Sequence, residues 1–140
     1  MKKQSIACIA FSGKKVLIAH RNPTGQMGGR WEFPGGKVED GETEEEAIVR
    51  EFSEEFGVTV KVGDFIAEKT FVHSGTPFSL RAYRIEVPHT GEAQKYALSE
   101  HTGYAWTKLD SIRGLNFVDS DKLLYPEIVS YAKKNGLFEI

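Results

Sequence analysis

Residues 36–58 read GKVEDGETEEEAIVREFSEEFGV, and this stretch decides the fold. Thr43 and, three residues later, Glu46 have the pattern of a capping box, in which each side chain binds the other's backbone at a helix start. Gly57 suits a left-handed helix C-cap, because glycine has no Cβ to clash in that conformation. Together these signals predict a helix over Glu44–Phe56.

Three carboxylates share one side of the predicted helix, because Glu54 and Glu55 follow Glu51 by three and four residues. Like charges at this spacing oppose helix formation by ~0.2–0.5 kcal/mol per pair. A bound divalent cation would reverse the sign, since Mg²⁺ takes oxygen ligands. Spacing alone leaves a solvated acidic face equally open. Arg50 either orients one of these carboxylates through a charge-assisted hydrogen bond or forms an ordinary surface pair with Glu54.

The acidic stretch dominates the charge distribution of this 140-residue chain. Residues 37–55 hold nine acids and two bases, which leaves 11 acids and 16 bases elsewhere, so −7 and +5 make up the net charge of −2. Such an acidic pole repels phosphate groups unless a cation intervenes. The 40% hydrophobic and 27% charged residues are typical of a globular domain and exclude disorder, collagen and coiled coil.

Several classes of partner and location are excluded by what the sequence lacks. The apolar runs IACIAF and VLIA fall far short of the ~20 residues of a membrane helix, and the first also ends too soon for a signal peptide. No basic tract is interleaved with aromatic residues, so no nucleic-acid partner is expected. Cys8 has no second cysteine to pair with, which fits a reducing, cytoplasmic setting. A chain of this length can fold by itself, and we expect a monomer or a homodimer.

Alternating and β-branched segments predict strands on both sides of the helix. The expected strands are Ser5–Phe11, Lys15–His20, Val58–Val62, Phe65–His73, Ser79–Val87 and Ala105–Lys108. Gly63 and Asp64 are expected to form a turn between two of them. A last helix is expected from Asp119 to Lys134, either kinked or split in two by Pro126. Strands around a middle helix, closed by a terminal helix, predict a single layered domain of α/β or α+β class.

The stretch 36–58 resembles the signature of the Nudix hydrolases without a gap. The matching positions are Gly36, Glu42, Arg50, Glu51, Phe52, Glu54, Glu55, Gly57 and Val58. The resemblance implies one Nudix domain over residues 1–140, an α/β/α sandwich with a mixed β-sheet. It also implies an enzyme that cleaves a phosphoanhydride bond in a nucleoside diphosphate linked to another group.

The resemblance further implies a cation site. Glu51, Glu54 and Glu55 would be ligands of Mg²⁺ or Mn²⁺, and a backbone carbonyl of Gly35 or Gly36 would add another. Among family members the general base is either a signature glutamate, here Glu51 or Glu54, or an acid on a later loop.

Glu100 is the later candidate for that base, and it could equally ligate a metal or be an exposed loop acid. His101 beside it is expected to be structural or exposed.

Within the family, the run from Trp31 to Glu39 and the closing helix are most similar to the MutT type. This type hydrolyses oxidised purine nucleoside triphosphates such as 8-oxo-dGTP to the monophosphate and pyrophosphate. By position, Phe33 would contact the base, Arg21 would bind base or phosphate, and Asp121 would read the purine edge. Each residue also has an alternative interpretation. Phe33 would be a core residue, Arg21 a solvated loop cation and Asp121 a helix-start acid.

The chain departs from the MutT pattern in two places, which leaves the nucleotide open. His20 stands where an arginine is expected, and residue 121 is Asp and not Asn. CTP or other pyrimidine nucleotides and dinucleoside polyphosphates are therefore alternative small-molecule substrates. The absence of proline between residues 58 and 76 disfavours ADP-ribose. A nucleotide-sensing domain without catalysis is a further alternative, although every signature glutamate is present.

Overall fold

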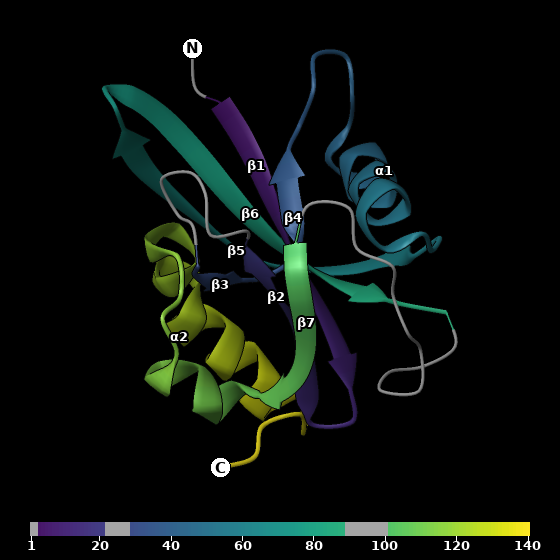
Figure 1. The fold of residues 1–140 in the computed structure, drawn as a ribbon, viewed down its shortest axis with the longest axis vertical. Helices are drawn as coiled ribbons and strands as arrows, with labels where there is room; N and C mark the ends of the chain where they lie inside the picture. Colours follow the sequence, from purple (N-terminus) through teal and green to yellow (C-terminus); the bar gives the residue numbers. More distant parts are fainter. Residues whose placement is uncertain (1–2, 22–28, 89–100) are drawn as a thin grey trace.

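The computed structural model describes residues 3–21, 29–88 and 101–140, and in it a mixed β-sheet lies between two α-helices (Figure 1). The strands are β1 Lys3–Ser12, β2 Lys15–Arg21, β3 Trp31–Glu32, β4 Gly35–Lys37, β5 Lys61–His73, β6 Thr76–Glu86 and β7 His101–Lys108. The helices are α1 Glu44–Phe56, the 3₁₀ helix η2 Leu109–Gly114 and α2 Asp119–Lys134. No helix within the described ranges has both the length and the apolar character needed to cross a bilayer.

The central strand β1 organises the sheet. The described strands run in the order β3-β2-β1-β6-β5, with β4 attached to β1 and β7 to β2. β1 is parallel to β6 and antiparallel to β2 and β4, so the sheet is mixed. Along one edge β1 changes partner: Phe11 and Ser12 pair with β2, whereas residues 5–7 pair with β4. This change of partner sets the glycine pair of β4 beside α1 (Figure 1).

Two apolar layers pack on opposite faces of the sheet, because neighbouring residues of β1 point in opposite directions. Ile6 and Cys8 face the layer under α1, whereas Ala7 and Ile9 face the layer under α2. The expected α/β/α sandwich is therefore confirmed. Burial raises the pKa of the Cys8 thiol far above its ordinary value, so this thiol is unreactive.

Helix α1 begins and ends where the local signals predict. Thr43 and Glu46 form the reciprocal capping box, and Gly57 adopts the left-handed conformation at φ 70°. The apolar residues that α1 packs against the sheet are all buried: Ala47, Ile48, Phe52 and Phe56. The cap and the apolar stripe together hold the acidic face in a fixed orientation toward the sheet edge.

The expected turn at Gly63 and Asp64 is wrong. Both residues lie inside the single long strand β5, which pairs with β6 through register shifts between Val62 and Ala67. A Cβ on Gly63 would lie 3.2 Å from the carbonyl oxygen of Arg84. Gly63 therefore permits a close approach of the two strands at a bulge. In the sequence, a glycine at a bulge resembles a glycine in a turn.

Other boundaries differ in length. The turn that joins β5 to β6 consists of Ser74 and Gly75, both with positive φ. β6 therefore begins at Thr76 and not at Ser79. β7 begins at His101, four residues before the expected start, and β3, β4 and η2 were not expected. Pro126 lies inside one helix, α2, so the split into two helices is wrong.

Candidate active site

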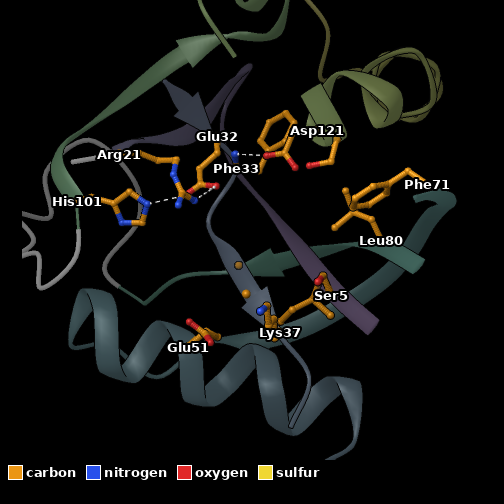
Figure 2. Close-up of a pocket in the computed structure, with 14 residues that line it drawn as sticks. Ser5, Arg21, Glu32, Phe33, Lys37, Glu51, Phe71, Leu80, His101 and Asp121 are labelled. Atoms are coloured by element: carbon orange, nitrogen blue, oxygen red, sulfur yellow. Dashed lines mark hydrogen bonds and ion pairs between the residues drawn. The ribbon is translucent and has the colours of Figure 1, made fainter. Parts of the chain in front are cut away.

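A pocket of about 520 Å³ opens where the ends of several strands meet α1 and α2 (Figure 2). This volume lies within the range that small-molecule sites occupy. Six of the residues expected to be functional line it: Arg21, Phe33, Gly35, Gly36, Glu51 and Asp121. The strands and helices thus bring together side chains that are separated by up to 100 residues in the sequence.

The three carboxylates of α1 differ in their surroundings. Glu51 faces the pocket and accepts a hydrogen bond of 3.0 Å from Nη1 of Arg50. The side chain of Glu54 is 61% exposed and lies 3.4 Å from the same nitrogen. Glu55 is buried and binds His101. Within the described ranges no three Asp, Glu, His or Cys side chains converge as a metal site, so the expected ligands share a helix side without forming a cluster.

The glycine pair of β4 shapes the cation side of the pocket. A Cβ on Gly36 would lie 2.4 Å from Oε1 of Glu51, so only glycine lets that carboxylate approach the strand. A Cβ on Gly35 would lie 2.0 Å from the carbonyl oxygen of Ile6. Carboxylate and carbonyl oxygens in this cradle are the donor type that a hard divalent cation prefers, so the residues fit such an ion.

Arg50 joins the signature loop to α1. Its Nε and Nη2 donate to the two carboxylate oxygens of Glu42 at 2.7 and 3.0 Å, and Nη2 also donates to the carbonyl of Lys37 at 3.1 Å. The hydrogen bonds from Arg50 to Glu42 lower the pKa of Glu42. The hydrogen bonds from Arg50 to Glu42 and Glu51 raise the pKa of Arg50. Arg50 therefore orients carboxylates at several points, and the expected i,i+4 pair with Glu54 is one of several contacts that it makes.

On the opposite side of the pocket, Arg21 belongs to a chain of charged contacts that the sequence did not indicate. Nη1 of Arg21 donates to both carboxylate oxygens of Glu32, at 3.1 and 3.2 Å. Nε2 of His101 lies 2.8 Å from Glu32, and Nδ1 of His101 contacts Glu55 (Figure 2 shows the first of these). Burial opposes a charge on His101, but the hydrogen bonds to Glu32 and Glu55 outweigh it and raise the pKa of His101.

His101 is therefore not an exposed loop residue, although one of the two expectations for it was exposure. The only sequence signal for Glu32 is its place in the run from Trp31 to Glu39, and for His101 its place beside Glu100. Glu100, expected as the later acid, lies outside the described residues.

Phe33 and Asp121 lie together at the end of the pocket beside α2 (Figure 2). Phe33 packs edge-on against Phe117 in the core, as one of its two expected roles requires, and it also lines the pocket. Asp121 accepts a hydrogen bond of 2.8 Å from the backbone N–H of Phe33. Burial, assisted by the charge of Glu32, raises the pKa of Asp121 to about 8. Asp121 lies in the first turn of α2, as a helix-start acid would, but it is buried there.

The model of the NUDIX domain family matches residues 1–128 of this chain. The chain belongs to the Nudix family. Nudix hydrolases act on phosphoanhydride bonds of nucleotides and generally use divalent cations, so this Nudix protein is a hydrolase of small nucleotide substrates.

Individual relatives share most of the chain. A Mycobacterium tuberculosis protein (strain CDC 1551 / Oshkosh), provisionally named 8-oxo-dGTP diphosphatase 2, is 35% identical over 120 residues, 84% of this Nudix chain and 81% of its own. The CTP pyrophosphohydrolase of Escherichia coli K12 is 36% identical over 101 residues, 72% of each chain. The solution structure of the E. coli ORF135 protein superposes with a TM-score of 0.81 at 28% identity, covering 96% of this chain and 94% of its own.

Proposed function

We propose that this Nudix hydrolase is a MutT-type nucleoside triphosphate pyrophosphohydrolase. It would convert oxidised purine nucleotides such as 8-oxo-dGTP to the monophosphate and pyrophosphate, and so remove damaged precursors of DNA synthesis. The observation that carries the proposal is one pocket that has Phe33 and Asp121 at one end and Glu51 and Gly36 at the other (Figure 2). A base and its phosphates would occupy these two ends together.

The base end suits recognition of a purine. Phe33 offers an aromatic wall, and one carboxylate oxygen of Asp121 is already committed to the backbone N–H of Phe33. The carboxyl group can therefore address the edge of a base with its other oxygen. Arg21, held by Glu32, supplies a cation for the base or for a phosphate. A site that satisfies the polar edge of its substrate rejects analogues that lack the matching groups.

The cation end suits Mg²⁺, with Mn²⁺ as a substitute. Glu51, Glu54 and Glu55 would hold the ion, together with a backbone carbonyl of Gly35 or Gly36. When bound, the ion would neutralise phosphate charge and lower the pKa of a coordinated water. Arg50 keeps Glu51 in place beside the glycine pair. Glu51, Glu54 or Glu100 would accept the proton of the attacking water.

CTP is the second candidate substrate, because a CTP pyrophosphohydrolase is among the relatives of similar identity. The Asp at position 121 suits this substrate as well, since the carboxyl oxygen that Phe33 does not use can accept from the exocyclic amine of cytosine. A cytoplasmic location fits either substrate, as nucleotides and a buried, unpaired Cys8 both belong to a reducing compartment.

The test is a substrate panel. Purified protein with Mg²⁺ is offered 8-oxo-dGTP, dGTP, CTP, ADP-ribose and a dinucleoside polyphosphate, and pyrophosphate and orthophosphate are measured separately. We expect the highest kcat/KM with 8-oxo-dGTP and release of pyrophosphate. Preference for CTP would establish the second candidate instead. Tight binding without turnover of any of them would indicate a nucleotide-sensing domain and overturn the proposal.

A further inference from the structure

His101 lies between two carboxylates, Glu32 on β3 and Glu55 on α1. Its Nε2 is 2.8 Å from Oε2 of Glu32, and its Nδ1 contacts Oε1 of Glu55, which also accepts from the backbone N–H of His101 at 3.1 Å. The three side chains are 10%, 18% and 8% exposed respectively, so water competes little for these contacts. One imidazole therefore holds two carboxylates at a fixed separation.

The sheet positions this arrangement. β2 pairs with β7 along its length, and His101 is the partner of Arg21 after a register shift between His20 and Arg21. Glu32 reaches the same place from β3, which pairs with β2 through Ala19 and His20. Arg21, Glu32 and His101 thus come from three hydrogen-bonded strands, and Glu55 comes from α1. Strands and helices hold side chains more precisely than loops do.

Glu32 in turn sets the orientation of Arg21. Nη1 of Arg21 donates to both oxygens of Glu32, whereas the buried Nε of Arg21 has no hydrogen-bond partner among the described residues. The position of the guanidinium group therefore depends on the Glu32 carboxylate, and that carboxylate depends on His101.

We propose that His101 is a positioning residue that serves both ends of the active site: through Glu32 it fixes Arg21 toward the nucleotide, and through Glu55 it fixes a ligand of the cation. The inference rests on the proposed function for the roles of Arg21 and Glu55. Neither role requires His101 to touch the substrate. Hydrogen-bonded partners of metal ligands commonly tune metal affinity, and the same logic applies here to the partner of an arginine.

Two amide substitutions separate the two contacts. The side-chain nitrogen of asparagine can take the place of Nδ1, and that of glutamine the place of Nε2. His101→Asn therefore keeps the contact with Glu55 and loses the contact with Glu32. His101→Gln does the opposite. His73→Gln, on an exposed residue at the end of β5, is the control for a histidine outside these contacts.

Two constants are measured for each variant: the Kd of Mn²⁺ without nucleotide, by electron paramagnetic resonance, and the KM of the best nucleotide at saturating Mg²⁺. We expect His101→Gln to weaken Mn²⁺ binding ~10-fold with a nearly unchanged KM. His101→Asn should raise KM by a similar factor with nearly unchanged Mn²⁺ binding. His101→Ala should impair both, and His73→Gln neither.

Equal effects of the Asn and Gln substitutions on both constants would overturn the inference, as would a lowered melting temperature with both constants unchanged. Glu55→Gln identifies which premise has failed. If it leaves Mn²⁺ affinity unchanged, Glu55 is not a ligand, and the proposed cation site and the cation half of the inference are both wrong. If Glu55→Gln weakens Mn²⁺ binding and His101→Gln does not, the proposed site stands and the positioning role is wrong. The Mn²⁺ measurement needs no turnover, so it is valid whichever nucleotide is hydrolysed.

Discussion

The carboxylate of Asp121, in the first turn of α2, accepts a hydrogen bond of 2.8 Å from the backbone N–H of Phe33, 88 residues earlier in the chain. The contact ties α2 to the segment between β3 and β4 and buries an acid beside Glu32. Burial and the neighbouring charge raise the pKa of Asp121 to about 8, so the folded protein binds a proton there that an unfolded chain releases near pH ~4.

The first prediction is that Asp121→Asn becomes more stable relative to the wild type as pH rises. The raised pKa stabilises the wild-type fold below pH ~4, and this contribution is lost progressively as pH rises toward 8, because the unfolded chain releases the proton that the buried carboxyl still holds. Asparagine keeps an oxygen acceptor for Phe33 but carries no charge. Between pH 5 and 9, the free energy of unfolding of the variant minus that of the wild type should therefore rise by a few kcal/mol. This is the order of magnitude that linkage gives for such a pKa difference.

Urea denaturation at several pH values measures this difference. Asp119→Asn is the matched control, since Asp119 is in the same helical turn but is 72% exposed, and its difference from the wild type should stay level over this range. Parallel stability curves for Asp121→Asn and the wild type would mean that Asp121 is ionised in the folded protein throughout.

The second prediction concerns Gly36→Ala. The added Cβ would lie 2.4 Å from Oε1 of Glu51, so the carboxylate must move away from β4. Because the obstructed group is the end of a flexible side chain, the fold should survive with a small change in melting temperature. A displacement of about 1 Å at a reacting centre can reduce the rate ~100-fold, and we expect a loss of kcat of this size.

Steady-state kinetics and thermal denaturation separate the two effects. Gly114→Ala is the control, because nothing lies within 4 Å of a Cβ at that position and its φ is not positive. Full activity of Gly36→Ala would show that Glu51 does not act from its place beside the glycine pair.

Local signals explain why α1 could be predicted from the sequence and much of the sheet could not. The capping box, the apolar stripe and Gly57 all lie within one continuous segment. The bulge at Gly63 and the short strand β4 depend on partners that are distant in the chain, namely β6 and β1. A glycine that permits a close approach of two strands cannot be distinguished in the sequence from a glycine that forms a turn. The turn expected at Gly63 and Asp64 is therefore wrong.

The active site divides in the same way. The signature indicated Glu51 and Arg50 because their spacing is local, and a family resemblance indicated Arg21, Phe33 and Asp121 by position. Glu32 and His101 acquire their importance only when β3 and β7 flank β2, and no motif marks that arrangement. Glu51, from the signature, and Arg21, Phe33 and Asp121, from the resemblance, line one pocket. No pattern in the sequence predicts that they lie together.

The third prediction is that Arg50→Lys impairs both stability and turnover. The guanidinium group donates to both oxygens of Glu42, to Glu51 and to the carbonyl of Lys37. An ammonium group cannot reproduce this planar set, although it keeps the charge. We expect a loss of ~1–3 kcal/mol in unfolding free energy, as for charge-assisted hydrogen bonds, together with a lowered kcat.

Arg113→Lys provides the comparison for Arg50→Lys. Arg113 is 67% exposed and pairs with Asp110 at 2.6 Å, an ordinary surface pair at i,i+3 spacing, so its replacement should change stability by less than ~1 kcal/mol and leave kcat unchanged. If the two lysine variants behave alike, Arg50 is a surface cation and does not organise the signature loop.

The fourth prediction is that Glu54→Gln lowers kcat by several orders of magnitude while the fold survives. The substitution removes a charge and keeps the shape, and a side chain that is 61% exposed contributes little to the core. If Glu54 binds the cation or accepts the proton of water, an amide cannot replace it in either role.

Chelation with EDTA should abolish wild-type turnover, and added Mg²⁺ should restore it. Glu45→Gln, on an exposed residue of the first turn of α1, should retain full kcat. Near-wild-type turnover by Glu54→Gln, measured beside this control, would remove Glu54 from the proposed cation site and leave Glu51 and Glu55 as its carboxylates.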